Sequence, residues 1–539
     1  MTESTQKGKN NKEDESLKVI AKISAKNKAA KKQPRKAPEK LQEIFDKLVG
    51  FDTKAKKLVR DAYFFAEEAH NGQLRKSGEP YFYHLVETAK NLADLGMDAK
   101  VIAAGILHDS IEDGVATEEQ LLYEFGEEIL FLVDGVTKLG HVRYKGLRRH
   151  NESLRKLFVA TSRDVRVLII KFADRLHNMQ TLEHVRPDKR ERIAIETLDI
   201  YAPLAYRLGI TTLSKQLEDL SFPYVYPEEY RKVRETLKER SKQTIAKLER
   251  MDRSISKKLA ANGMRKFRTD HRIKGTYSFY RKLDRKKGDA DKIYDIAALR
   301  IIVPTVADCY SVLGIVHQNY RPMVGRIKDY IAVPKPNGYR SIHTTVFTGD
   351  GGLVELQIRT EDMHIDSQFG AASHLGYKKS TGGDQNVDSW AVRLLGKFGD
   401  GGSSPTKSPS EVAPGWVGEL AEHADNPESD TFQTELKADF FRHQIFVFTP
   451  LGEVIVLPEG STPVDFAFQV HSEVGNKMSG VKVNEKMVSL ETELLNGDII
   501  EVLTSKSGKP TAKWLDFVVT NEAKRKIRSY LEKEELAKR

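Results

Sequence analysis

Residues 101–114 read VIAAGILHDSIEDG, and this segment decides how the first half of the chain folds. Its apolar run predicts a buried helix that leads directly into His108 and Asp109. Glu112 and Asp113 follow at a spacing of four, which on a helix places His108 with Glu112 and Asp109 with Asp113. The segment therefore predicts a polar site at the end of an otherwise apolar helix.

These side chains suit a divalent metal. An adjacent histidine and aspartate can bind a cation, and carboxylates on the next turn can orient or deprotonate a water. His84, in EPYFYHLVE, and Asp174, in KFADRLHNMQTL, are further candidate ligands. The alternative is a surface helix end with solvated charges. We favour the metal site, because apolar runs precede both His108 and Asp174 and a buried carboxylate without a partner is costly.

Helical periodicity extends outward from this segment, from about residue 41 to residue 222. In TKAKKLVRDAYFFAEEAH, for example, Leu58, Ala62, Phe65 and Ala69 recur at spacings of three and four. This part of the chain is predicted to be an all-α domain.

After residue 260 the pattern changes to short β-branched runs with interleaved helical segments, which predicts an α+β domain. In GLVELQIRT the alternation places Glu355, Gln357 and Arg359 on one strand face. An exposed sheet face is the alternative, but two basic segments, HRIKGTYSFYRKLDRKK and GRIKDYIAVPKPNGYRSIHTTV, favour a ligand site. Basic side chains facing the acidic Asp295 and Glu355 suit Mg²⁺-assisted phosphoryl or pyrophosphoryl transfer.

The length of 539 residues exceeds one hydrophobic core, and shifts in composition divide the chain. We predict a basic disordered tail at 1–45, the helical domain at 46–222, the α+β domain with leading helices at 223–380, a Gly/Ser/Pro-rich linker with short helices at 381–437, a small β-rich module at 438–505 and the start of a helical region at 506–539.

The net charge of +10 favours polyanionic partners, nucleotides or RNA, without choosing between them. Cys309 is the only cysteine, which excludes a disulfide framework and indicates a reducing cytoplasm. No apolar run approaches the ~20 residues that span a bilayer, and we expect no membrane association. The sequence does not give the oligomeric state.

Five segments closely resemble the HD-type hydrolase domain of the RelA/SpoT homologue family: AHNGQLRKSGEPYFYH, ILHDSIED, VDGVTKLG, DVRVLIIKFADRLHNMQTLE and IYAPLAYRLGI. The resemblance implies a manganese-dependent hydrolase that removes the 3′-pyrophosphate of (p)ppGpp. The Mn²⁺ ligands that it implies are His84, His108, Asp109 and Asp174. Glu112 and Asp113 would position the attacking water, and Arg75 would contact a substrate phosphate.

The second region resembles the (p)ppGpp synthetase domain of the same family, with a nucleotidyltransferase-like fold. The resemblance implies transfer of pyrophosphate from ATP to the 3′-hydroxyl of GDP or GTP. Asp295 would be a Mg²⁺ ligand, Glu355 a second ligand or the base for the 3′-hydroxyl, and Tyr339 would stack on the guanine. The other substrate-binding candidates are Arg272, Lys274, Lys282, Arg326, Lys328, Lys335, His343 and Gln357. Residues 326–329 read RIKD, the form found in bifunctional members, whereas synthetase-only members carry an acidic version.

Residues 444–505 resemble a TGS domain, a small β-grasp-like module. In long family members this module contacts the 3′ end of uncharged tRNA on the ribosome, and His471 is the residue we expect to read that end. A core or surface histidine is the alternative for His471. Long members continue into further domains that are not present here, so the chain is either shortened or a naturally short form.

The resemblance thus implies a stringent-response enzyme that makes and destroys (p)ppGpp at two sites under reciprocal control. Two alternatives stay open: a hydrolase with a weak synthetase, or a tRNA- or ribosome-binding sensor with vestigial catalysis. The complete sets of acidic and metal-ligating residues argue against the second alternative.

Overall fold

The computed structural model describes residues 38–48, 50–137, 147–289, 293, 296–335, 337–348, 352–370, 372, 444–451, 454–495, 497–505 and 508–538. They belong to two units, which span residues 1–422 and 423–539. Residues 1–37, the predicted linker at 381–437 and the candidate ligand Asp295 lie outside the described residues. Within the described part of the chain, no helix combines the length and apolar character needed to cross a membrane.

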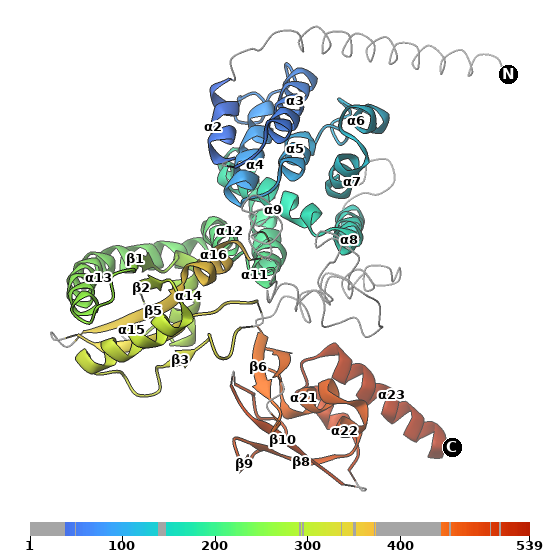
Figure 1. Ribbon diagram of the computed structural model, residues 1–539. Helices are drawn as coiled ribbons and strands as arrows, with labels where there is room; N and C mark the ends of the chain where they lie inside the picture. The colour runs from blue at the N-terminus through green and yellow to red at the C-terminus, as the bar shows by residue number, and fades with distance from the viewer. Residues whose placement is uncertain are drawn as a thin grey trace. The chain divides into compact units, whose positions relative to one another are not determined.

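The first unit begins with a helical domain (Figure 1). Its elements are α2 (Glu39–Lys47), α3 (Thr53–Ala69), α4 (Phe82–Asp94), α5 (Ala99–Leu107), α6 (Glu118–Phe125), α7 (Glu127–Val136), α8 (Leu147–Arg163), α9 (Arg166–Gln180), η1 (Leu182–His184), α10 (Pro187–Glu196), η2 (Thr197–Tyr201), α11 (Ala202–Arg207) and α12 (Thr211–Val225). Helix α5 is its centre, because it packs on α3, α4, α7 and α9 and is buried from Val101 to Leu107. This confirms the predicted buried helix before His108.

Two sequence expectations in this domain need correction. The predicted tail at 1–45 extends too far, because α2 carries Leu41, Ile44 and Phe45 on a buried face that packs on α4. Helix α5 also ends at Leu107, so residues 108–114 form turns rather than a continuing helix. One helical hydrogen bond survives there, from Asp113 N to Asp109 O (2.9 Å), and it keeps the carboxylates on one turn.

Helices α12 and α13 (Pro227–Ala261) connect the helical domain to the α+β domain. A proline at the first helical position, Pro227, starts α13 immediately after α12 ends. Phe222 of α12 is buried in one cluster with Val233 of α13 and Phe279 of α14 (Thr276–Arg285). The predicted boundary between residues 222 and 223 therefore falls inside a helix that packs on both domains.

The α+β domain contains a five-stranded sheet in the order β1-β2-β5-β4-β3. Its strands are β1 (Arg268–Ile273), β2 (Ala297–Val303), β3 (Lys328–Asp329), β4 (Ile342–Phe347) and β5 (Leu353–Thr360). Strands β2 and β5 pair in parallel, and the other neighbours are antiparallel. One face is apolar and shares a core with α13 and α15 (Val306–Asn319). Helix α16 (Glu361–Phe369) follows β5 and packs on β5, β2 and α12.

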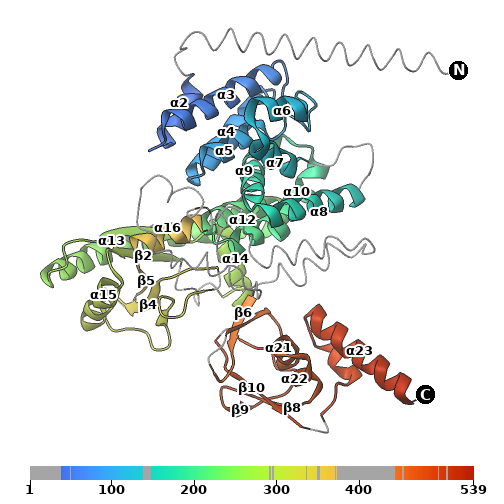
Figure 2. The same ribbon diagram turned by 45° about the vertical axis from the view of Figure 1, so that its right-hand side comes forward.

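The second unit is a small β-rich module (Figure 1, Figure 2). It contains β6 (Gln444–Phe448), β7 (Val454–Pro458), α21 (Pro463–Val470), α22 (Ser472–Asn476), β8 (Met478–Val483), β9 (Lys486–Met487), β10 (Ile500–Thr504), η6 (Ala512–Asp516) and α23 (Asn521–Lys538). Sheets β10-β8-β9 and β6-β7 share one core with α21 and α23. The all-α domain, the α+β domain and the β-rich module predicted from the sequence are all confirmed.

A buried carboxylate fastens α23 to this module. Asp465 of α21 is fully buried and accepts hydrogen bonds from the amide and hydroxyl of Thr462, the amide of Val519, and the amide and hydroxyl of Thr520. Because these donors come from both sides of the carboxylate, Asp465 links α21 to the turn that begins α23.

Replacement of Asp465 by alanine is expected to loosen α23, because buried donors lose a charged acceptor at about 1.5–3 kcal/mol each before relaxation. Hydrogen–deuterium exchange of the full chain should show protection falling for residues 521–538 by at least tenfold. The matched control is Lys509→Gln, which removes the exposed ion pair between Lys509 and Glu534 of α23 (3.0 Å). This variant should leave protection unchanged. Equal protection in the two variants would contradict the role of Asp465.

Candidate functional site

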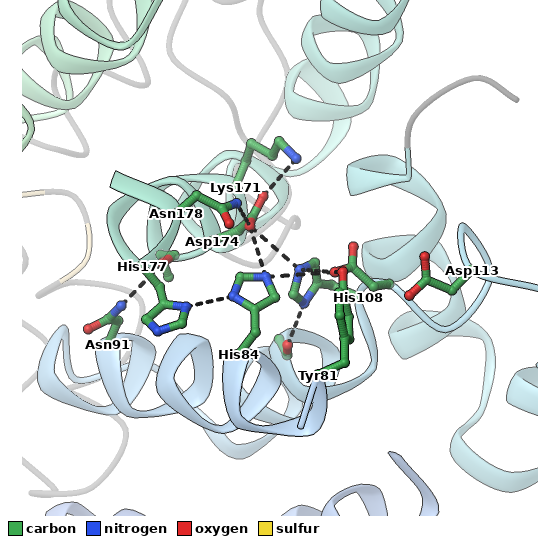
Figure 3. A network of polar contacts seen from close by, with 12 residues as sticks. Tyr81, His84, Asn91, His108, Asp113, Lys171, Asp174, His177 and Asn178 are labelled. Atoms are coloured by element: carbon green, nitrogen blue, oxygen red, sulfur yellow. Dashed lines mark hydrogen bonds and ion pairs between the residues drawn. The ribbon is translucent and has the colours of Figure 1, made fainter. Parts of the chain in front are cut away.

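The four predicted metal ligands meet in one buried cluster. His84 comes from α4, His108 and Asp109 from the turn after α5, and Asp174 from α9. Figure 3 shows His84, His108 and Asp174 side by side. The Nε2 atom of His84 lies 3.2 Å from Asp174 Oδ1 and 3.7 Å from Asp109 Oδ2. The Nε2 atom of His108 lies 3.2 Å from Asp109 Oδ2 and 3.7 Å from Asp174 Oδ1. Ligand atoms of His84, His108 and Asp109 lie within 4.8 Å of one another, which suits one metal ion, and Asp174 adjoins both imidazoles.

The tautomer of His108 fits a metal ligand. Its Nδ1 donates to the carbonyl of Gly105 (2.8 Å), so in the neutral ring Nε2 carries a lone pair directed at the carboxylates. Among the described residues, none forms a hydrogen bond with that buried Nε2. Burial alone lowers the pKa of His108, but Asp109 and Asp174 outweigh it and raise that pKa to about 10. The carboxylates therefore favour a positive charge at this ring nitrogen, which either a proton on Nε2 or a divalent metal bound there would supply.

The tautomer of His84 is set by Arg75, which the sequence predicted as a substrate contact, and by His177, which sequence reasoning missed. Arg75 Nη1 lies 3.3 Å from His177 Nδ1, and since arginine only donates, that nitrogen accepts. The Nδ1 atom of His84 lies 2.7 Å from the same nitrogen and donates to it, sharing the single lone pair of His177 Nδ1 with the more distant Arg75, which leaves the lone pair of His84 Nε2 facing Asp174 and Asp109. Figure 3 shows His84 between His177 and His108. Burial, His84 and Arg75 lower the pKa of His177 to about 3, so this ring stays neutral.

The carboxylates are held by further donors. Lys171 Nζ donates to Asp174 Oδ2 (2.8 Å) and Asn178 Nδ2 to Asp174 Oδ1. Tyr81 donates its hydroxyl to Asp109 Oδ2 (2.6 Å). Although burial raises the pKa of Asp174, Lys171 and the two imidazoles hold it well below its usual value. Lys171 and Asn178 stand at spacings of three and four from Asp174 on α9, a helical signal that was present in the sequence.

The residues predicted to act on water and substrate border this cluster. Arg75 donates to Asn178 Oδ1 (2.8 Å) and Thr181 Oγ1 (3.2 Å), which places it at the end of α9. Asp113 is exposed, and its Oδ2 lies 3.8 Å from the buried Nε2 of His70, another residue that sequence reasoning missed. Glu112 is half-buried on the same turn.

Replacement of His177 by phenylalanine is expected to weaken metal binding by about 10–100-fold, because the ring that fixes the His84 tautomer loses its acceptor. Phenylalanine keeps the stacking on His84, whose ring centroid lies 5.0 Å away. Calorimetric titration with Mn²⁺ measures the Kd. The control is His184→Phe, a histidine exposed on η1, which should bind as the wild type does. Wild-type affinity in the His177 variant would contradict this account.

The predicted nucleotide site lies on the polar face of the five-stranded sheet. The alternation predicted for β5 is confirmed: Val354, Leu356 and Ile358 are in the apolar core, while Glu355 and Gln357 face the other way beside Thr345 and His343 of β4. Arg272 on β1 pairs with Ala298, which pairs in turn with Glu355. Gln357 and Arg359 are nevertheless buried, so that part of the face is covered, whereas Glu355 and His343 are partly exposed.

Several of the basic candidates interact electrostatically with Lys335, whereas Arg326 stands apart from them. Burial and then the charge of Lys328 lower the pKa of Lys335 to about 8; Glu355 opposes this shift, and Arg272 and Lys282 add to it. Lys335 Nζ also lies 5.5 Å from the centre of the Tyr339 ring. Lys274 donates its amide to Ile296 O (2.9 Å) at the end of β1. Arg326 is exposed in the loop before β3, and none of the described contacts joins its side chain to the others.

His471 lies in the second unit, exposed between α21 and α22. Its Nδ1 accepts from the amide of Glu473 (3.2 Å) and caps α22, so Nε2 carries the hydrogen. The alternative of a buried core histidine is therefore wrong.

Fold and sites together define a multidomain protein with a helical domain that carries a buried His/Asp cluster, an α+β domain with a basic polar sheet face and a TGS-like module. Family models match in the same order: the HD domain at residues 62–211, the region found in RelA / SpoT proteins at 271–382 and the TGS domain at 445–504. The guanosine-3′,5′-bis(diphosphate) 3′-pyrophosphohydrolase of Aquifex aeolicus is 42% identical over 92% of this chain and 67% of its own length. The chain belongs to the RelA/SpoT family.

One further relative is matched over less of its own length, and one solved structure is matched over less of this chain. The GTP pyrophosphokinase of Myxococcus xanthus is 43% identical over 89% of this chain and 61% of its own length, so this chain spans only about two thirds of such relatives or less. The solved structure of small alarmone synthetase 2 from Bacillus subtilis is 32% identical in the part that matches, which covers 26% of this chain and 78% of that one, at a TM-score of 0.20.

Proposed function

We propose that this chain is a bifunctional alarmone enzyme of the stringent response. One site hydrolyses (p)ppGpp to GDP or GTP and pyrophosphate, and the other transfers pyrophosphate from ATP to the 3′-hydroxyl of GDP or GTP. The observation that carries the proposal is the buried cluster of His84, His108, Asp109 and Asp174, whose imidazole lone pairs face carboxylates. The names of the relatives, a pyrophosphohydrolase and a pyrophosphokinase, support both halves. The proposal also includes the domain limits predicted from the sequence, corrected as described above at the N-terminal tail and at the boundary after residue 222.

For hydrolysis, the four-residue cluster would hold Mn²⁺, and the bound ion supplies Lewis-acid chemistry to a water and a phosphate. Glu112 and Asp113 would orient the water and take its proton as it attacks the 3′-phosphate. Arg75, fixed by Asn178 and Thr181, would bind the departing pyrophosphate.

For synthesis, Tyr339 would stack on the guanine. Asp295 would bind Mg²⁺, and Glu355 would be a second Mg²⁺ ligand or the base that takes the proton of the 3′-hydroxyl. The cations around Lys335 would neutralise the pyrophosphate during its transfer, and Arg326, Lys328, His343 and Gln357 complete the proposed substrate contacts. Glu355 accepts hydrogen bonds at Oε1 from His343 (3.1 Å) and Gln357 (3.0 Å), which fix its orientation.

Metal removal tests both halves. Chelation of the purified chain is expected to stop breakdown of added ppGpp and formation of ppGpp from ATP and GDP. Mn²⁺ should restore breakdown and Mg²⁺ should restore synthesis, each followed by nucleotide chromatography. Breakdown that persists without metal would contradict the hydrolase site. Restored breakdown without any synthesis would reduce the chain to a hydrolase.

The TGS domain supports a further partner. We propose that uncharged tRNA, on the ribosome, contacts this module through the exposed His471. Replacement of His471 by alanine should remove any change in synthesis rate on adding uncharged tRNA and ribosomes, while the rate without them stays as in the wild type. A lower rate without tRNA would instead indicate a structural role for His471.

A further inference from the structure

Four side chains of β4 and β5, together with Tyr339 from the loop before β4, form a closed ring of hydrogen bonds. Arg359 Nη2 lies 2.7 Å from the Tyr339 hydroxyl, which lies 2.8 Å from His343 Nε2. His343 Nδ1 lies 3.1 Å from Glu355 Oε1, which also accepts from Gln357 Nε2 at 3.0 Å. Arg359 Nη2 closes the ring on Gln357 Oε1 at 2.9 Å.

The chemistry of its two ends fixes every proton in this ring. Arginine can only donate and an ionised carboxylate can only accept. The Tyr339 oxygen therefore accepts from Arg359 and gives its own hydrogen to His343 Nε2. His343 must then carry its hydrogen on Nδ1 and donate it to Glu355. Both branches run from Arg359 to Glu355, so the arginine determines the orientation of all four other groups.

Arg359 is suited to this role because it is itself immobilised. Only 1% of its surface is exposed, and its Nη1 donates to Ser367 Oγ of α16 (2.8 Å). The backbone oxygen of Ser367 accepts in turn from Thr211 Oγ1 at the start of α12. The Cζ atom of Arg359 also lies 5.0 Å from the centre of the Tyr339 ring. The guanidinium thus supports the aromatic ring that the proposed function assigns to the guanine.

We propose that Arg359 is a positioning residue of the pyrophosphate-transfer site: it holds Tyr339 for the guanine and, through Tyr339 and His343, aims Glu355 at the 3′-hydroxyl. This inference rests on the proposed function. It extends the site to the buried Arg359 and to its anchor Ser367.

The test is a double-mutant cycle of Arg359→Lys and Tyr339→Phe, assayed for synthesis in an Asp109→Ala chain that cannot destroy its product. Lysine keeps the charge but not the planar fork, and phenylalanine keeps the stacking ring but not the hydroxyl. Each change should lower kcat/KM for GDP about tenfold, by raising KM for GDP and lowering kcat, with KM for ATP unchanged. The double variant should lose clearly less than the roughly hundredfold product of the two.

A full hundredfold loss in the double variant would mean that Arg359 acts independently of Tyr339, and would overturn the inference. A fall in kcat alone would indicate a smaller folded fraction, and would overturn it as well. If Arg359→Lys does not fold, Ser367→Ala replaces it in the same cycle, with a severalfold rise in KM for GDP expected. The matched control is Arg268→Lys, whose exposed arginine on β1 also bonds α16 through Glu361 (2.7 Å) and should leave all constants unchanged. If the Asp109→Ala chain forms no product, the proposed synthetase is overturned together with this inference. If it forms product and Arg359→Lys leaves kcat and KM for GDP unchanged, the inference alone is overturned.

Discussion

Replacement of Asp109 by alanine is expected to lower ppGpp hydrolysis by on the order of 10³-fold or more, while synthesis from ATP and GDP continues. Asp109 Oδ2 faces both imidazoles of the cluster and accepts from Tyr81, so alanine removes a ligand and the negative charge that balances a cation. Both rates can be followed by nucleotide chromatography, with Mn²⁺ for hydrolysis and Mg²⁺ for synthesis.

The matched control is Asp134→Ala in the same domain. Asp134 is a half-exposed carboxylate on α7 that pairs with Lys156 (2.8 Å), and its loss should change hydrolysis less than twofold. Hydrolysis by the Asp109 variant within tenfold of the wild type would contradict the metal site. Loss of both activities together would indicate a folding defect, which circular dichroism can detect.

Replacement of Glu355 by glutamine should produce the opposite pattern, with synthesis reduced by about 10²–10⁴-fold and hydrolysis retained. Glutamine has the same shape and keeps an oxygen that can accept from His343 and Gln357. The ring of hydrogen bonds can therefore persist, so the loss would report the carboxylate itself, as metal ligand or as base.

Glu361→Gln provides the control for that variant. Glu361 follows the same strand, at the start of α16, and its exposed carboxylate pairs with Arg268, so its loss should leave synthesis unchanged. If Glu355→Gln retains synthesis, Glu355 is neither base nor essential ligand. If both activities fall, the hydrolase and synthetase sites are coupled, although they lie in different domains.

The sequence alone predicted the site residues where one element carries the signal. The apolar run before His108 predicted a buried helix, and α5 is buried throughout its last two turns. The alternation in GLVELQIRT predicted which face of β5 is polar, and the sheet register confirms it. Periodicity succeeds here because the geometry of a single helix or strand fixes the side on which each side chain stands.

Element ends were predicted less well. The helix before His108 stops at Leu107, α2 begins inside the predicted tail, and the domain boundary at residue 222 lies within α12. The second and the third of these depend on packing between elements. The buried face of α2 rests on α4, and Phe222 enters a cluster with α13 and α14. Local composition carries no record of such contacts.

What the sequence determined by itself, then, is which residues carry the chemistry: two imidazoles, a set of carboxylates, and a polar strand with basic neighbours. Only the tertiary structure decided how they orient one another. Arg75 and His177, separated by 102 positions, fix the tautomer of His84, and Arg359 directs a ring that ends on Glu355. The physical reason is that hydrogen-bond direction depends on which donor faces which acceptor across different elements, and no spacing within one element encodes that pairing.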